Sequence, residues 1–167
     1  MKIDGAPHRS RMTNHFLLIT TDGETENGKR ASARTLIDWR LERRQWPLYA
    51  GTRHKMTMRA GDLLLFYQGG SRPGRQNIVA QARIDSIRSA GRDDEFDPPW
   101  MLSSAADQVL ALTDVRVLAN AVPIRPLMGE ISILPKLRYW GALLMGGCRK
   151  MTEDDYDLII ARSKRQA

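Results

Sequence analysis

Long apolar runs, cysteine and histidine are all scarce in this sequence of 167 residues. The longest apolar run covers only residues 63–67, whereas a membrane-spanning helix needs about 20 apolar residues. Cys148 is the single cysteine, which excludes an internal disulfide and a thiolate metal cage and fits a reducing compartment. Residues 1–12 carry several charges and no apolar stretch, so they do not resemble a secretory signal. We therefore expect a cytoplasmic protein without membrane association.

Familiar catalytic and metal-binding motifs are also missing. The sequence has no nucleophile elbow, no GxxxxGK[ST] loop, no HExxH motif and no paired-cysteine zinc spacing. The three histidines, at positions 8, 15 and 54, show no spacing that suggests shared metal ligation. We therefore expect no metal, no cofactor and no catalytic residue, and a protein that is not an enzyme.

Charge is plentiful but unevenly distributed. The chain has 26 Lys and Arg against 19 Asp and Glu, for a net charge of +7, and residues 1–83 hold 15 basic against 7 acidic side chains. Arginine supplies 20 of the 26 cations, and its planar guanidinium suits phosphates and base edges. This charge fits a polyanionic partner, and it fits equally well a basic surface that only promotes solubility.

The length and the apolar pattern predict one domain. We expect a flexible amino-terminal segment over residues 1–13 and a single domain over residues 14–167. Apolar spacing predicts a helix that begins near residue 33 and ends before Pro47, and a second helix begins after the N-cap Thr152. Apolar and β-branched runs predict strands over residues 15–20, 63–67 and 78–87 and around 114–118.

Aromatic residues occur where core packing alone does not require them. Trp46, Tyr49 and Trp100 fall in predicted loops, Tyr67 ends a predicted strand, and Trp140 precedes a glycine. Aromatic faces in a basic cleft can hold an unstacked base, because stacking contributes about 1–3 kcal/mol per base. The alternative is that these rings cover the ends of a small barrel.

Several segments carry a family resemblance through their order and spacing. They are the strand 15–20, the helix leading to Trp46, residues 59–67, the return strand 78–82, and residues 138–141 with 151–156. Together they resemble the EVE domain family, relatives of the YTH readers within the PUA-like fold. The resemblance covers about residues 14–162. It implies an α+β fold in which a small curved β-barrel is flanked by α-helices.

The resemblance also implies a function and the residues that perform it. It implies a pocket for a modified base of DNA or RNA: methylated or hydroxymethylated cytosine, or methylated adenine. Trp46 matches the first wall of such a pocket, Trp100 resembles a second wall, and Tyr67 with Gly69 matches the strand end beside it. Tyr49 and Trp140 are further candidate rings. Nucleic acid is then the expected partner, with a separately encoded nuclease as a candidate second partner.

Phosphate contacts are expected from five arginines. They are Arg40, Arg43 and Arg44 on a basic face of the first helix, and Arg72 and Arg75 in the loop after the strand 63–67. Such contacts make binding fall steeply with salt.

One enzymatic alternative stays open. PUA-like folds include ASCH-like proteins, some of which resemble amidohydrolases that act on acylated nucleosides through a lysine, a threonine and a glutamate. Lys55, Thr57 and Glu130 are of these types, although they are also ordinary surface residues.

Overall fold

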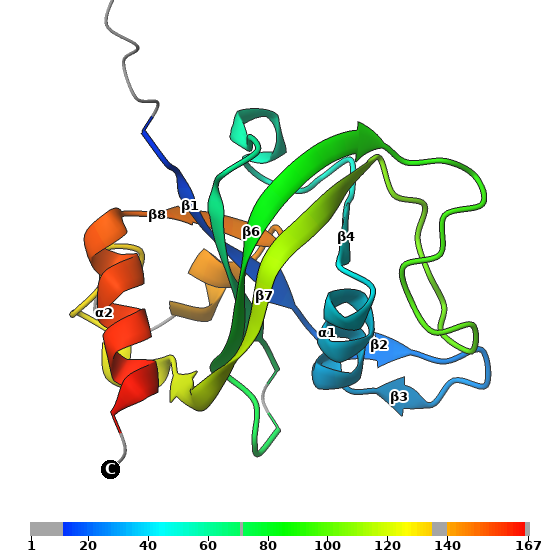
Figure 1. Ribbon diagram of the computed structural model, residues 1–167. Helices are drawn as coiled ribbons and strands as arrows, with labels where there is room; N and C mark the ends of the chain where they lie inside the picture. Colours follow the sequence, from blue (N-terminus) through cyan, green and yellow to red (C-terminus); the bar gives the residue numbers. More distant parts are fainter. Residues whose placement is uncertain (1–11, 71, 135–139, 166–167) are drawn as a thin grey trace, which may run out of the picture.

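The computed structural model describes residues 12–70, 72–134 and 140–165 (Figure 1). Most of the predicted flexible segment, residues 1–11, therefore lies outside the described residues. The strands are β1 (His15–Thr20), β2 (Gly23–Glu24), β3 (Arg30–Ala31), β4 (Gln45–Leu48), β5 (Leu63–Gln68), β6 (Asn77–Ser89), β7 (Gln108–Pro123) and β8 (Cys148–Met151). The helices are α1 (Ala33–Glu42) and α2 (Glu153–Lys164), with short 3-10 turns η1 (Lys55–Thr57), η2 (Arg125–Leu127) and η3 (Trp140–Leu144).

Six strands form one curled sheet in the order β4-β7-β6-β5-β1-β8. β1 and β5 run parallel, and every other neighbouring pair in this sheet is antiparallel. The long strands β6 and β7 shift register at three places, and such bulges bend and twist a strand pair. Figure 1 shows the resulting arc, with α1 and α2 on different sides of it. The predicted α+β fold, a small curved barrel flanked by helices, is confirmed.

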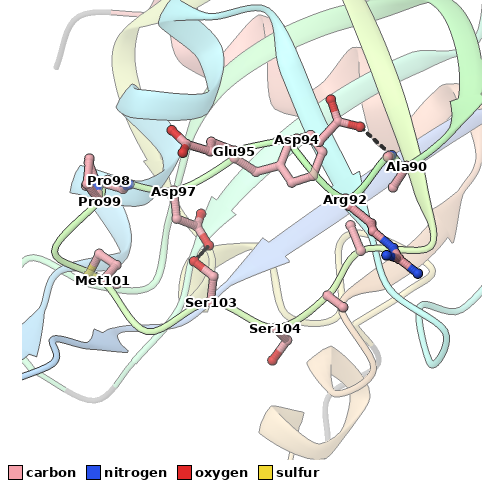
Figure 2. A pocket seen from close by; sticks show the side chains of 14 residues that line it. Ala90, Arg92, Asp94, Glu95, Asp97, Pro98, Pro99, Met101, Ser103 and Ser104 are labelled. Carbon is pink, nitrogen blue, oxygen red and sulfur yellow. Dashed lines mark hydrogen bonds between the residues drawn. The ribbon is translucent and has the colours of Figure 1, made fainter.

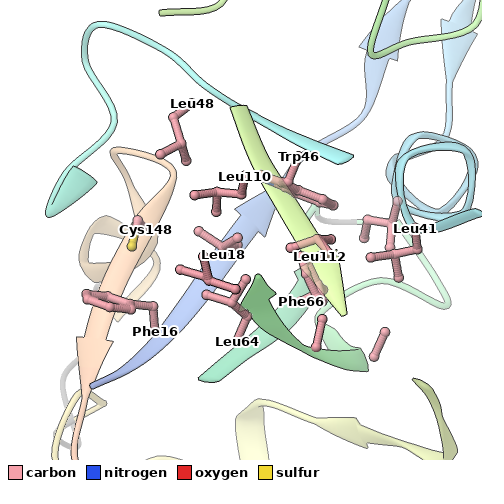
Figure 3. Close-up of a cluster of buried hydrophobic side chains, with 14 of the residues drawn as sticks. Phe16, Leu18, Leu41, Trp46, Leu48, Leu64, Phe66, Leu110, Leu112 and Cys148 are labelled. Carbon is pink, nitrogen blue, oxygen red and sulfur yellow. The ribbon is translucent and has the colours of Figure 1, made fainter. Parts of the chain in front are cut away.

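The sheet separates two hydrophobic cores. Residues alternate between its faces, so Phe16 and Leu18 of β1 pack inside the curl, whereas Leu17 packs with Tyr156 and Ile159 of α2. Figure 3 shows the inner cluster, in which Trp46, Phe66 and Leu110 lie together with the thiol of Cys148. Burial raises the pKa of this thiol to about 12, so Cys148 behaves as a small apolar residue.

The predicted elements agree with the structure where the sequence signal is local. The strand of residues 15–20 and the helix after Thr152 are confirmed, and the Thr152 side chain accepts a hydrogen bond from the Asp155 backbone N–H at 3.1 Å. The loop predicted around Trp46 is wrong, because residues 45–48 form β4. β4 lies at the edge of the sheet, where Pro47 is tolerated. Within the described part of the chain, no helix is long and apolar enough to cross a membrane.

Candidate functional site

Three segments that are distant in sequence meet at one edge of the sheet. Because β1 and β5 are parallel, their carboxyl ends reach this edge together, with Ile19 opposite Tyr67 and Thr20 opposite Gln68. The loop that leads into β8 arrives at the same edge, where the Ile19 backbone N–H donates to the Gly147 carbonyl at 2.9 Å. The topology therefore builds a concave site from the beginning, the middle and the end of the described chain.

A pocket of about 470 Å³ lies at this edge. Its side-chain walls come from Ile19, Thr21, Tyr67, Gln76, Leu144 and Met145. Glycines form much of the rest, namely Gly69, Gly70, Gly141, Gly146 and Gly147. This volume lies within the range of small-molecule sites, which are mostly apolar with a few polar groups that fix orientation.

At two of these glycines, beside Tyr67, the backbone leaves little room for a side chain. A Cβ on Gly69 would lie 3.3 Å from the Thr20 carbonyl oxygen, which already accepts the Gly69 N–H at 2.8 Å. Gly70 has a φ of +117°, a conformation that side-chain-bearing residues rarely adopt. The pocket wall between Tyr67 and Gly70 therefore consists of close-packed backbone, and a ligand can approach that backbone directly.

Tyr67 supplies the aromatic surface of the pocket, and Gln76 a polar edge. Tyr67 is 3% exposed, and burial raises the pKa of its hydroxyl to about 12, so the ring is uncharged at neutral pH. The Gln76 side chain accepts a hydrogen bond through Oε1 from Arg125 Nε at 2.7 Å. Because a guanidinium only donates, this contact fixes the amide orientation and leaves the Gln76 NH₂ group available as a donor.

Only some of the predicted base-binding residues meet at this pocket. Tyr67 and Gly69 line it together. Trp140 begins η3, whose residues Gly141 and Leu144 line the pocket, but the Trp140 side chain lies outside the described part of the structure. Tyr49 is half-buried in the turn after β4, where its hydroxyl accepts a hydrogen bond from Arg40 at 3.3 Å.

Trp46 is a core residue and not a wall of this pocket. Its side chain is 4% exposed, and its ring packs against Phe66 with centroids 4.6 Å apart. The Arg40 guanidinium covers the ring at 4.9 Å. The expectation of an accessible ring at this position is therefore corrected, because pairing of β4 with β7 turns Trp46 into the inner core.

The five predicted phosphate-binding arginines have different environments. Arg40 is buried and pairs with Asp97 at 2.7 Å, so its expected place on an exposed basic face is wrong. Arg75 is half-buried and pairs with Asp22 at 3.1 Å. The exposed members are Arg43, Arg44 and Arg72. Arg43 also stacks on Trp39, with its guanidinium carbon 3.3 Å from the ring centroid.

A second pocket, of about 520 Å³, lies within the loop of residues 90–106 (Figure 2). Its lining includes Asp94, Glu95 and Asp97, and Figure 2 shows Asp97 accepting a hydrogen bond from Ser103. The hydrogen bond from Arg88 lowers the pKa of Asp94 to about 2. Arg88 and Arg40 neutralise Asp94 and Asp97, and Arg92 also lines this pocket, so the pocket offers no excess of positive charge to a polyanion. Trp100 belongs to this loop and is 48% exposed, but it lines neither this pocket nor the pocket at Tyr67.

Comparisons with known proteins give matches in fold. No protein-family model matches the sequence, and no curated protein matches it significantly. Human THYN1, crystallised with DNA that contains 5-methylcytosine, superposes with a TM-score of 0.55 at 14% identity, over 93% of this chain and 100% of that chain. A hypothetical protein from Leishmania major gives 0.56 at 14% identity, over 93% and 98%. The N-terminal domain of Staphylothermus marinus McrB gives 0.54 at 12% identity, over 89% and 93%.

This chain has the fold of human THYN1. The likeness covers nearly the whole of each chain, so it concerns the complete arrangement of sheet and helices.

The candidate amidohydrolase residues lie in separate contacts. Lys55 pairs with Asp107 at 2.6 Å, whereas Glu130 pairs with Arg162 of α2. Neither ion pair includes Thr57, whose hydroxyl donates to the His54 carbonyl at 2.8 Å.

Several pocket residues could not be identified from the sequence. Ile19, Leu144 and Met145 are ordinary apolar residues in their local context, and Gln76 follows the glycine-rich loop without a recognisable motif. The signal that could have found them is the parallel pairing of β1 with β5, which is a property of the fold and not of any one segment.

Proposed function

We propose that this protein is a nucleic-acid-binding module that recognises a modified base in the pocket at the carboxyl ends of β1 and β5. The observation that carries the proposal is the pocket itself, with an apolar and aromatic wall, a fixed amide donor and a glycine backbone rim. The structure of human THYN1, which has the same fold, contains 5-methylcytosine DNA, and this supports a base as the ligand.

The chemistry of the pocket suits a flat heteroaromatic ring that carries a small apolar group. Tyr67, Ile19 and Leu144 contribute apolar surface to the lining and can enclose a methyl group of a base. Burying one methyl group stabilises a complex by about 0.8 kcal/mol, which corresponds to a roughly fourfold preference. The Gln76 NH₂ group can donate to a ring nitrogen or a carbonyl oxygen of the base.

The base must leave the helical stack before it can enter this pocket. Extrusion from a duplex costs a few kcal/mol and costs least for bases that are already unpaired. We therefore expect single-stranded or locally opened sites to bind more tightly than an intact duplex of the same sequence.

The test is a substitution that fills the pocket with a side chain and leaves the fold unchanged. Gly141 lines the pocket, does not have a positive φ, and a Cβ there would meet no atom of the described residues within 4 Å. Gly51 shares this freedom but lies outside the pocket, so Gly51→Leu is the matched control for Gly141→Leu. Fluorescence anisotropy with labelled DNA and RNA oligonucleotides, unmodified or carrying methylated or hydroxymethylated cytosine or methylated adenine, measures each affinity.

We expect one modified base to bind roughly fourfold more tightly than its unmodified counterpart in the wild type and in Gly51→Leu. In Gly141→Leu this preference should disappear, because the leucine side chain occupies the space of the base. Equal affinities for all oligonucleotides in the wild type would contradict the proposal, and so would a preference that survives in Gly141→Leu.

A further inference from the structure

A group of positively charged side chains lies beside the pocket on the side of η1 and β8. It consists of Arg53, Arg149 and Lys150, called here the rim cations. Among the residues that the structure describes, none of the three forms an ion pair with a carboxylate. By contrast, Arg40 and Arg75, two of the expected phosphate ligands, are neutralised internally by Asp97 and Asp22. The rim cations therefore carry charge that no described side chain compensates.

Arg53 is attached directly to the pocket rim. Its backbone N–H donates to the carbonyl of Gly146 at 3.2 Å, and Gly146 lines the pocket. The side chain lies against the same glycine, since a Cβ on Gly146 would be 2.8 Å from Arg53 Nε. The exposed Arg53 guanidinium is thus held next to the opening through which a base would enter.

β8 begins directly after the pocket residue Gly147 and carries the other two cations on opposite faces, with Lys150 opposite Phe16 of β1. Arg149 lies opposite Leu17 of β1, and residues of a strand alternate between faces, so Arg149 shares the face of Leu17 and of the pocket residue Ile19. Its Nε is buried and has no hydrogen-bond partner within the described part of the chain. Lys150 is exposed. Arg149 is half-buried, so an anion at this rim can meet its guanidinium only through the exposed part of the group.

The charges of all three rim cations act on His54. It follows Arg53, and its ring lies 6.4 Å from the ring of Phe16 in β1. Burial lowers the pKa of His54, and the charges of Arg149, Lys150 and Arg53 lower it further. One imidazole thus experiences all three rim cations at once.

We propose that the rim cations bind the phosphates of the nucleic-acid strand that flank the base held in the pocket, an inference that rests on the proposed function. Like charges that are clustered without counterions repel one another, and a polyanion removes this repulsion and releases its own condensed counterions. The position at the rim suits the backbone of a flipped nucleotide, because the phosphates must stay outside the apolar pocket while the base enters it.

The test compares two double variants. One removes two exposed charges at the rim, and the other removes two exposed charges elsewhere on the molecule. The rim variant is Arg53→Gln with Lys150→Gln. The control is Lys164→Gln with Arg165→Gln, which removes the same charge from two exposed side chains at the carboxyl end of α2. Affinity for a short duplex and for a single strand is measured over a range of salt concentrations, with thermal unfolding as a check of folding.

For the rim variant we expect affinity to fall roughly tenfold at low salt, and the slope of log K against log salt to shrink by roughly 1.8 on duplex DNA, about 0.9 per lost phosphate contact. The control should retain the wild-type slope, and both variants should keep the preference for the modified base. Arg149→Gln should shrink the slope by about 0.9.

The outcomes separate this inference from the proposed function. An unchanged slope in the rim variant, with the base preference intact, overturns the phosphate surface alone, and an equal loss in the control does the same. Absence of binding to every oligonucleotide overturns both. Binding of the wild type, but not the rim variant, to vesicles of phosphatidylserine and phosphatidylcholine, without competition by DNA, would assign the surface to a membrane.

Binding at this rim should also be linked to protonation of His54. Phosphates neutralise Arg53, Arg149 and Lys150, so the lowered pKa of His54 rises in the complex and a proton is taken up. Affinity should therefore increase as the pH falls below about 6.5, the ordinary pKa of histidine, towards the lower pKa that His54 has in the free protein. His54→Asn removes the titrating group and tolerates the left-handed φ of +62° at this position. A pH dependence that persists in His54→Asn would contradict this link.

Discussion

Replacing Trp46 with alanine is expected to lower the free energy of unfolding by about 3–5 kcal/mol, because the substitution empties the centre of the inner core. The ring is 4% exposed and packs between Phe66 and the Arg40 guanidinium. Urea unfolding followed by circular dichroism measures the loss. The matched control is Trp100→Ala, which removes a ring that is 48% exposed and should change stability by about 0.5 kcal/mol or less.

Trp46→Ala and Trp100→Ala also distinguish two roles for Trp46. The structure makes it a core residue, whereas the sequence led us to expect a wall of the base-binding pocket. If Trp46 were a pocket wall, its loss would abolish base-dependent binding and leave stability nearly unchanged. A Trp46→Ala protein with wild-type stability and no preference for a modified base would therefore move the binding site from Tyr67 into the curl of the sheet.

Removing Asp97 should destabilise the protein by a similar amount, about 3–5 kcal/mol, because it leaves the buried Arg40 guanidinium without a counter-charge. Both side chains are almost fully buried, and the pair is 2.7 Å apart. In Asp97→Ala the link from α1 to the loop of residues 90–106 is lost as well, since Asp97 also accepts the Ser103 hydroxyl at 3.1 Å. Hydrogen exchange should therefore become faster in this loop.

Two controls define the cause of that loss. Asp38→Ala breaks the exposed pair with Arg34 at 2.8 Å and should cost only about 0.3–0.5 kcal/mol. The double variant Arg40→Met with Asp97→Ala removes both charges and should recover much of the stability that Asp97→Ala loses. If the double variant is no more stable than Asp97→Ala, the uncompensated charge is not the source of the effect.

Local signals in the sequence predicted the elements that form the frame of the fold. The apolar run of β1 and the capped start of α2 need no distant partner to be recognised, because their residues satisfy the strand and helix patterns on their own. The order of such segments was enough to indicate the curved barrel with its flanking helices.

Features that depend on residues far away in the sequence could not be predicted in the same way. Arg40 lies seven residues after Ala33 on the buried side of α1, and its counter-charge is Asp97, 57 positions away. Trp46 lies beside Pro47 in a four-residue strand whose partner is β7, more than 60 positions later in the chain. The pocket likewise depends on three separate segments, so the sequence indicated Tyr67 and Gly69 but not Gln76 or Leu144.

The pairing of β8 with β1 means that the site is complete only after residue 151 has been synthesised. β1 is complete at Thr20, but Gly146 and Gly147 reach the pocket only when β8 docks beside it. A nascent chain that has not yet exposed residue 151 therefore holds the Tyr67 wall without the opposite rim. Since such long-range pairings form slowly, we expect binding competence to appear together with the last folding step, so that incomplete chains do not compete for the ligand.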